Sequence, residues 1–219
     1  MDQEVSTPVS EQAYWDISAL LSRNRSWADA KKSRDPSFFH RLSEQQKPRY
    51  FWIGCSDSRV PATEIVDLDP GEMFVHRNVA NLAVASDPNF AAALHFAIDV
   101  LRVQHVIVAG HYGCGGIHAA MTHEMDDPID GWLSPIKKLQ GSFKRESTAF
   151  SDDANALCEQ NVIAQVEALA ANPIVRTAWS RGQLLAIHGW VYAIENGLLK
   201  ELYGPIIAPS PDDDAIGRY

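Results

Sequence analysis

The sequence predicts an α/β fold: a single domain over residues 1–219 with a mostly parallel central sheet of about four to five strands, flanked by helices. Three observations lead to this prediction. Short apolar runs alternate with segments of helical periodicity along most of the chain. Hydrophobic residues make up 46% of the 219 residues, which is enough for a sizeable core. Glycines 54 and 110 directly follow apolar runs, as expected where buried parallel strands end in loops.

An N-terminal helical arm is predicted over residues 11–35, before the first strand. Apolar side chains recur there at roughly helical spacing, at Tyr14, Ile17, Leu20, Leu21 and Trp27. No core strand precedes the arm to receive these side chains. We therefore expect it to pack on another part of the fold or, as the fold prediction favours, on a partner subunit.

The remaining elements alternate along the chain. Apolar runs predict strands at residues 50–54, 73–75, 106–109 and 184–188. Helical spacing predicts helices at residues 89–101, 114–121, 158–169 and 174–180. Glu195-Asn196-Gly197 predicts the turn of a hairpin over residues 191–199. Residues 126–151 are polar and contain Pro128, Gly131 and Pro135, so we expect an irregular excursion with little core and assign it no function.

Charge and cysteine content argue against several classes of protein. The net charge of -9 does not suit nucleic acid as a partner, because phosphate binding needs clustered Lys and Arg. Met1-Asp2-Gln3-Glu4 is acidic and resembles neither a secretory signal nor a transit peptide, and no apolar stretch is long enough to span a membrane. Three cysteines without an export signal argue against a disulfide framework. We therefore expect a cytoplasmic protein.

Two short runs carry the candidate metal ligands, Gly54-Cys55-Ser56-Asp57-Ser58-Arg59 and Gly110-His111-Tyr112-Gly113-Cys114-Gly115-Gly116. Each run follows a predicted strand, and ligands of open parallel sheets collect beyond the carboxyl ends of the strands. Cys55, His111 and Cys114 provide two thiolates and an imidazole, which zinc prefers. A catalytic zinc has three protein ligands and keeps a fourth position for water or substrate. These residues predict a zinc enzyme that activates water.

Asp57 and Arg59 lie two residues apart in an extended stretch, so their side chains can meet. A bidentate pair would fix the orientation of the Asp57 carboxylate beside the metal and keep it ionised, and we assign both residues catalytic roles. The alternative is a surface ion pair of small energy. Asp57 is also near enough to the ligands to take the fourth metal position in a closed state.

Other interpretations of these residues fit less well. A structural zinc site would need a fourth Cys or His, and none is suitably spaced. Cys158 falls on the apolar face of a predicted helix, where a buried thiol is expected. The glycines at 113, 115 and 116 match neither the dinucleotide fingerprint nor the Walker pattern. That mismatch also argues against a zinc alcohol dehydrogenase.

The two runs resemble those of the β-class carbonic anhydrases, whose hallmark is Cys-x-Asp-x-Arg followed much later by His-x-x-Cys. The resemblance covers roughly residues 10 to 205. It extends through Lys47-Pro48-Arg49, Phe51-Trp52-Ile53-Gly54, Pro70-Gly71-Glu72, Phe74-Val75-His76-Arg77-Asn78-Val79-Ala80-Asn81 and Ile187-His188-Gly189-Trp190-Val191-Tyr192.

The resemblance implies reversible hydration of carbon dioxide to bicarbonate and a proton, through attack of a zinc-bound hydroxide on CO2. It implies one Zn2+ per subunit, and a homodimer or a dimer-of-dimers tetramer. Val79, Phe96 and Gly115 would line the CO2 pocket, with Val79 and Phe96 from opposite subunits. Because two thiolates cancel the formal charge of Zn2+, we expect the metal to acidify water less than a three-histidine site does, and activity to be biased to alkaline pH.

One subgroup of that family has a non-catalytic bicarbonate pocket, and this chain resembles it at Trp52, Arg77 and Tyr192. A guanidinium fork, an indole N–H and a phenol O–H are suitable donors for such an anion. Bound bicarbonate would favour the closed state at Asp57. The alternative is ordinary packing of two aromatic residues around a structural arginine.

Two other functions stay open at this stage. One is a zinc hydrolase on the same scaffold that acts on carbon disulfide or carbonyl sulfide, which assays of CO2 hydration and sulfide release would separate. The other is a non-enzymatic bicarbonate sensor. The presence of both Asp57 and Arg59 favours the enzyme.

Overall fold

The computed structural model describes residues 11–122, 128–142 and 150–208. The chain divides into two compact units, Met1–Gln46 and Lys47–Tyr219.

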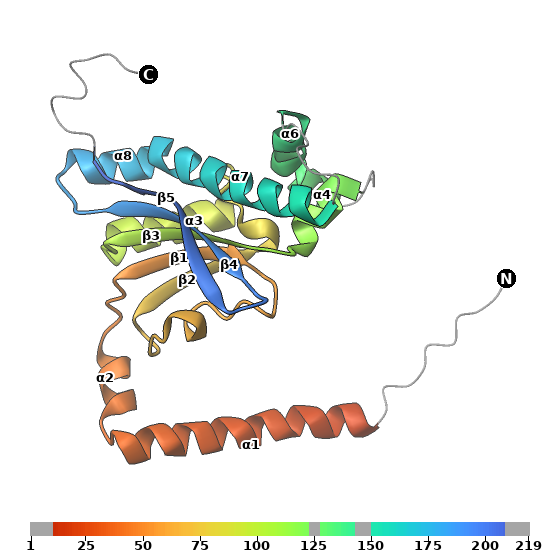
Figure 1. Ribbon diagram of the computed structural model, residues 1–219. Helices are drawn as coiled ribbons and strands as arrows, with labels where there is room; N and C mark the ends of the chain where they lie inside the picture. The colour runs from red at the N-terminus through yellow and green to blue at the C-terminus, as the bar shows by residue number, and fades with distance from the viewer. Residues whose placement is uncertain (1–10, 123–127, 143–149, 209–219) are drawn as a thin grey trace. The chain divides into compact units, whose positions relative to one another are not determined.

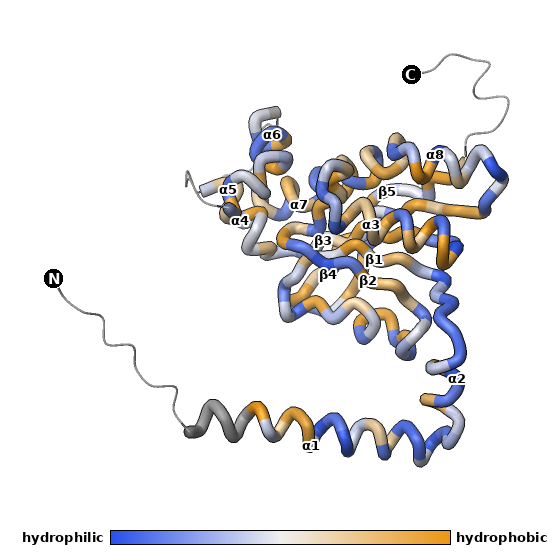
Figure 2. The backbone as a smooth tube through the Cα atoms, turned by 180° about the vertical axis from the view of Figure 1, so that it is seen from behind, coloured by the Kyte–Doolittle hydropathy of each residue, from blue (hydrophilic) through white to orange (hydrophobic). Residues whose placement is uncertain are grey.

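The first unit contains two helices, α1 (Glu11–Arg34) and α2 (Phe38–Glu44). The Trp27 ring meets the Phe39 ring edge-on at 5.6 Å, and the Lys31 ammonium lies 5.0 Å from the centre of the Phe38 ring. The helical arm expected from the sequence is therefore present. Ile17, Leu20 and Leu21 are 53–64% exposed. Figure 2 shows hydrophobic stretches along the part of α1 that is coloured. Their packing on a partner subunit stays a prediction.

The second unit is built on a five-stranded sheet (Figure 1). Its strands are β1 (Tyr50–Cys55), β2 (Met73–Asn78), β3 (His105–His111), β4 (Ala186–Ala193) and β5 (Leu198–Ile206), in the order β2-β1-β3-β4-β5. The first four strands are parallel, and β5 is antiparallel to β4. The predicted mostly parallel sheet is thus confirmed.

The fourth strand differs from its prediction. Residues 184–188 and 191–199 were expected to form a short strand and a separate hairpin, whereas β4 runs without a break from Ala186 to Ala193. The strand continues because its residues pair with β3 on one side and with β5 on the other. The hairpin turn falls at residues 194–197, as the Asn-Gly pair predicts.

Helices connect the strands, and proline and capping residues mark several starts. They are α3 (Pro88–His95), the π-helical turn η3 (Phe96–Val100), α4 (Gly115–Thr122), α7 (Phe150–Ala171) and α8 (Pro173–Ser180), with short 3-10 turns η1 (Glu64–Val66) and η2 (Val79–Asn81). Asp87 caps α3 by accepting from the Asn89 and Phe90 amides, and Asn172 caps α8 in the same manner. Pro88 and Pro173 each occupy the first helical position, where no backbone N–H is needed.

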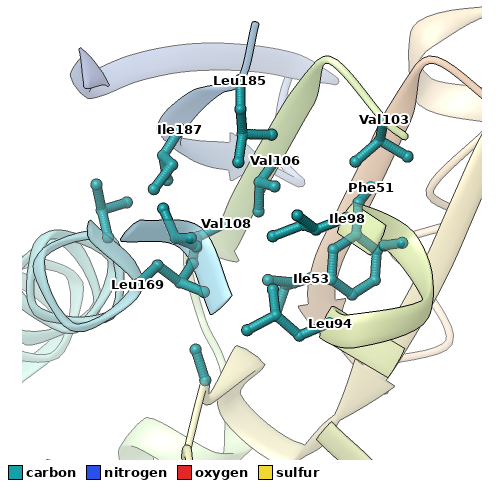
Figure 3. Packing of buried hydrophobic residues seen from close by; sticks show 14 of the residues in the cluster. Phe51, Ile53, Leu94, Ile98, Val103, Val106, Val108, Leu169, Leu185 and Ile187 are labelled. Atoms are coloured by element: carbon teal, nitrogen blue, oxygen red, sulfur yellow. The ribbon is translucent and has the colours of Figure 1, made fainter. Parts of the chain in front are cut away.

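The main core lies between one face of the sheet and the helices α3, α7 and α8. Alternate strand residues Phe51, Ile53, Val106, Val108 and Ile187 point into it, and Leu94, Ile98 and Leu169 pack against them (Figure 3). On the opposite face, Trp52, Ile107 and Ala109 form a smaller cluster with Ala62, next to η1. The two faces of the sheet are therefore covered unequally.

The irregular excursion predicted for residues 126–151 is wrong in its described part. Residues 128–142 form α5 (Pro128–Trp132) and α6 (Ser134–Ser142), and Leu133 and Ile136 are fully buried. Pro128 and Pro135 sit in the first turns of these helices, where proline is tolerated, so they start the helices rather than prevent them. Residues 126–127 and 143–149 lie outside the described part. None of the described helices has the length and apolar composition needed to cross a bilayer.

Candidate metal centre

The sheet brings the three predicted zinc ligands together at one edge. Cys55 is the last residue of β1 and His111 the last of β3, and these parallel neighbours end side by side. Gly113, with φ of +66°, turns the chain so that Cys114 follows just before α4. The three side chains are 0–5% exposed, and one ligand atom of each lies within 4.8 Å of the other two.

The distance between the two sulfurs of this cluster fits a tetrahedral zinc ion. The sulfurs of Cys55 and Cys114 are 3.8 Å apart. Two thiolates bound at about 2.3 Å to one tetrahedral zinc would be separated by about 3.8 Å. A disulfide would need about 2.05 Å.

The His111 ring is oriented for a metal on its Nε2 atom. Its Nδ1 lies 3.1 Å from the Tyr112 carbonyl oxygen, which leaves the lone pair on Nε2 when the Nδ1–H donates. Nε2 is buried and has no hydrogen-bond partner within the described ranges. A buried nitrogen without a partner is costly, and metal coordination removes that cost.

The electrostatics of the two thiols also point to a cation. The hydrogen bond shared by the two sulfurs lowers the pKa of Cys55 to about 4. The same bond to Cys55, together with burial, raises the pKa of Cys114 far above its usual range. The protein alone therefore stabilises one thiolate and leaves a proton on the second sulfur. A divalent cation is what the second thiolate requires.

Asp57 and Arg59 form the bidentate pair expected from the sequence. Arg59 Nε donates to Asp57 Oδ1 at 3.0 Å, its terminal nitrogen donates to Oδ2 at 2.7 Å, and its backbone amide donates to Oδ1 at 2.9 Å. The hydrogen bond from Arg59 holds the pKa of Asp57 well below its usual range. Asp57 Oδ2 lies 3.7 Å from His111 Nε2, so the ionised carboxylate lies beside the metal ligands without hydrogen-bonding to them.

Helix α7 supports the ligand loop through contacts that the sequence analysis missed. Glu159 accepts a hydrogen bond from the Tyr112 hydroxyl and another from Lys200 at 3.0 Å. Asn155 Oδ1 accepts from the Gly113 amide at 3.4 Å. The only available signal in the sequence was a set of polar residues spaced three to four apart on one helix face.

Cys158 also lies on this side of α7, and its thiol donates to the His111 carbonyl oxygen at 3.2 Å. Burial raises the pKa of Cys158 to about 12. It is therefore a protonated, buried thiol, as expected, and it stands outside the group of three ligand atoms.

The residues predicted to line the CO2 pocket are not all together within one chain. Val79 packs beside the first turn of α4, because a Cβ on Gly116 would lie 2.9 Å from its side chain. Gly115 is the first residue of α4, and no atom lies within 4 Å of where its Cβ would be. Phe96, by contrast, is 40% exposed and packs on Phe74, near the amino end of β2. A role for Phe96 at a partner's site stays a prediction.

Of the predicted bicarbonate trio, Trp52 is completely buried on β1. Its indole nitrogen lies over Gly54, where a Cβ would approach it to 2.2 Å, so only glycine leaves room for the ring. Its ring meets that of Trp190 edge-on at 6.5 Å. Trp190 is thus a neighbour of Trp52 that the sequence did not bring forward.

The structure does not group the other two members of the trio as closely. Arg77, on the edge strand β2, donates to the carbonyl oxygens of Cys55 at 2.8 Å and Asp57 at 2.5 Å. Tyr192 lies on β4, separated from β1 by β3, and its hydroxyl is near Gly197 in the hairpin turn. The described contacts therefore connect Arg77 to the metal-ligand segment rather than to Tyr192.

Comparison with known proteins identifies relatives along most of the chain. The family model described as carbonic anhydrase matches residues 50–199. A carbonic anhydrase of Emericella nidulans is 38% identical over 204 residues, which cover 92% of this chain and 88% of that protein. The solved structure of a Coccomyxa β-carbonic anhydrase in complex with acetazolamide has a TM-score of 0.84 at 38% identity, and the match covers 91% of both chains. A tetrameric β-carbonic anhydrase from Sordaria macrospora has a TM-score of 0.82 at 36% identity, covering 86% of this chain and 98% of the other.

Proposed function

The chain belongs to the β-class carbonic anhydrase family and is an enzyme of that family, and from this premise we propose that it interconverts carbon dioxide and bicarbonate at Cys55, His111 and Cys114, with one Zn2+ per subunit. The observation that carries the proposal is the convergence of three buried ligand atoms within 4.8 Å, beside an ionised Asp57. The orphaned Nε2 of His111 supports a metal at this place.

Zinc, when bound here, would supply a Lewis acid that lowers the pKa of a coordinated water and makes it a nucleophile at modest pH. Asp57 supplies the acceptor for that water, because its Oδ2 is ionised and lies next to the ligand set. Arg59 fixes both carboxylate oxygens through its fork, so the accepted hydrogen and the attacking lone pair take defined directions. Asp57 and Arg59 therefore orient the nucleophile.

The surroundings of the centre suit a small apolar substrate. Val79 presents an apolar side chain beside α4, and Gly115 leaves open space next to Cys114. CO2 has no charge to anchor, so exclusion of water and an apolar wall are the main requirements. In our proposal, Phe96 of a second copy completes this wall.

We also propose self-association as a homodimer or a dimer of dimers. The tetrameric Sordaria macrospora relative supports this, as do the exposed apolar side chains of α1. Light scattering of the full chain tests it, and a monomer at working concentrations would contradict it and the shared CO2 pocket together.

Regulation by bicarbonate is the finer part of the proposal. Arg77 supports the backbone on both sides of Ser56 by donating to the carbonyls of Cys55 and Asp57. An anion bound beside Trp52 and Tyr192 would draw the guanidinium away and free Asp57 to leave Arg59 for the metal. Protons should favour that closed state, so activity should fall steeply below about pH 8, since metal-bound water titrates near neutrality or above.

The test combines zinc content with stopped-flow CO2 hydration between about pH 6 and about pH 9. We expect about one zinc per chain and activity that rises toward alkaline pH. Sulfide release from carbon disulfide is assayed in parallel. Zinc binding with sulfide release but no CO2 hydration would replace the proposal with the hydrolase, and zinc binding with neither activity would favour the bicarbonate sensor.

Tyr192→Phe tests the regulatory part separately. It should weaken bicarbonate inhibition while zinc content stays normal. Unchanged inhibition, or a shallow one-proton pH profile in the parent, would remove the switch and leave the catalytic proposal in place.

A further inference from the structure

Three side chains of α7 contact the ligand loop, residues 111–114. The second and third follow the first by three and four residues, so they lie on one face of the helix, and they are Asn155, Cys158 and Glu159. Each forms a hydrogen bond with a different residue of the loop, in that order Gly113, His111 and Tyr112. The helix therefore holds the loop at three consecutive residues.

The peptide unit that joins Tyr112 to Gly113 has the most direct relation to a proposed metal ligand. Its carbonyl oxygen accepts a hydrogen bond from His111 Nδ1 at 3.1 Å. Its N–H donates to Asn155 Oδ1 at 3.4 Å. A peptide unit is planar, and in the trans form its C=O and N–H point in opposite directions. Asn155 therefore holds, from the far side, the carbonyl that fixes the His111 ring.

The two neighbouring peptide units are held by other groups. In the preceding unit, the His111 carbonyl accepts from the Cys158 thiol at 3.2 Å and the Tyr112 amide donates to the Tyr192 carbonyl at 3.1 Å. In the following unit, the Gly113 carbonyl accepts from the Arg59 guanidinium at 3.3 Å. Among the described bonds, Asn155 is thus the side chain that holds the middle unit against the pull of His111.

Gly113 makes such a hold necessary. Its φ of +66° suits glycine, and no atom lies within 4 Å of where its Cβ would be. Glycine populates both signs of φ readily, so neither its own side chain nor its packing fixes the peptide plane. On the other side of the unit, Glu159 accepts from the Tyr112 hydroxyl and is itself held by Lys200 at 3.0 Å. The Tyr112 end is anchored by its ring, and the Gly113 end is anchored by Asn155.

We propose that Asn155 is a positioning residue of the metal centre, which orients the Tyr112–Gly113 peptide so that its carbonyl fixes the His111 ring with Nε2 free for the metal. The bond at the N–H also polarises the peptide and makes its carbonyl a better acceptor. A hydrogen bond at the second ring nitrogen fixes the tautomer and raises the basicity of a ligating histidine. The inference rests on the zinc site proposed above but not on the identity of the substrate. The alternative is that Asn155 only ties α7 to the loop and has no effect on His111.

The test measures zinc release from the zinc-loaded protein to a chromogenic chelator. Asn155→Leu removes the acceptor oxygen, keeps a side chain of similar length and suits a helix. We expect release to accelerate about tenfold, the lower end of what outer contacts of metal ligands contribute. Asn155→Asp keeps an oxygen that can accept from the Gly113 amide, so it should release zinc at the parental rate. If Asn155→Leu does not fold, Asn155→Ala is read in the same way.

Nuclear magnetic resonance of the same zinc-loaded proteins reports on His111 itself. The resonance of its Nδ1–H proton should move upfield in Asn155→Leu, because a weaker hydrogen bond deshields the proton less, and should stay near the parental position in Asn155→Asp. Asn172→Ala is the matched control, since it removes the asparagine that caps α8 by accepting from the Ile174 amide at 2.9 Å. It should lower the melting temperature and leave both zinc release and the His111 resonance unchanged.

Several results would overturn the inference. They are unchanged zinc release in Asn155→Leu, equal acceleration in Asn155→Leu and Asn155→Asp, equal acceleration in Asn172→Ala, and faster release without a shift of the His111 resonance. The last result would assign Asn155 to general support of the loop. A parent protein that binds no zinc would overturn the proposed metal site, and this inference with it.

Discussion

Removal of the Arg59 guanidinium should reduce turnover strongly while the metal stays in place. Arg59 makes three hydrogen bonds to the Asp57 carboxylate, two from its side chain and one from its backbone amide. Arg59→Ala deletes the first two and keeps the third, so Asp57 stays near the ligands but can rotate. Loss of such orientation typically costs about 10- to 100-fold in activity, and we expect kcat/KM for CO2 to fall by this factor.

The expected pH dependence distinguishes a loss of Asp57 orientation from a change in Asp57 protonation. Arg59 depresses the pKa of Asp57, and its removal lets that pKa rise toward the ordinary value of 3.8. The carboxylate is therefore ionised at neutral pH in both proteins. The pH–rate profile of Arg59→Ala should therefore have the same shape as that of the parent above about pH 6, because Asp57 stays ionised there. The rate itself should be lower at every pH.

Arg59→Lys is the matched control, because it keeps the positive charge but not the planar fork. We expect a rate between those of the parent and Arg59→Ala, with normal zinc content in all three proteins. Stopped-flow CO2 hydration and metal analysis provide both numbers. Full activity in Arg59→Ala would refute the positioning role, and full activity in Arg59→Lys would show that charge alone suffices.

Three further predictions concern the ligands, the proposed regulation and stability. Cys55→Ser should lose zinc and activity together, because a site with three protein ligands has no spare ligand. Cys158→Ser should keep both zinc and activity. Metal analysis that finds zinc in Cys55→Ser, or none in Cys158→Ser, would reverse these assignments. Trp52→Phe removes the indole N–H and should weaken bicarbonate inhibition without loss of zinc, and inhibition curves identical to the parent would exclude Trp52 from the pocket. Burial lowers the pKa values of His105 and His188, whose rings are hydrogen-bonded to each other at 3.1 Å. The unfolded chain therefore binds more protons than the folded chain at acidic pH. The free energy of unfolding should consequently fall as pH drops below about 6.5. Denaturant titrations of His105→Gln should show a weaker dependence in this range, and an unchanged dependence would contradict the assignment.

The sequence by itself was sufficient to identify the three side chains that converge at one edge of the sheet, and the strands that lead to them. Cys55 and His111 follow short apolar runs that are typical of buried strands, and parallel strands end at one edge of a sheet. Asp57 and Arg59 are near neighbours in the chain, so their pairing is a local matter that spacing predicts. Cys114 follows from its distance of three residues from His111.

The tertiary structure decided what depends on distant residues and on weak local signals. The sequence does not reveal the helices α5 and α6, because a proline among polar residues can end a helix or begin one, and here Pro128 and Pro135 lie in first turns. Phe96 packs on Phe74 near the amino end of β2, whereas Cys55 and His111 lie at the carboxyl ends of their strands, and this placement depends on how η3 packs in the fold.

The left-handed turn at Ala80 shows the same limit most clearly. Nothing in the local sequence favours that conformation, since alanine disfavours it intrinsically. It is imposed by Asn161, which lies 81 residues further along the chain and is brought to Ala80 only when α7 packs on the sheet. Local spacing determined which residues could bind a metal, whereas a long-range hydrogen bond in the buried interior decided the backbone conformation at Ala80.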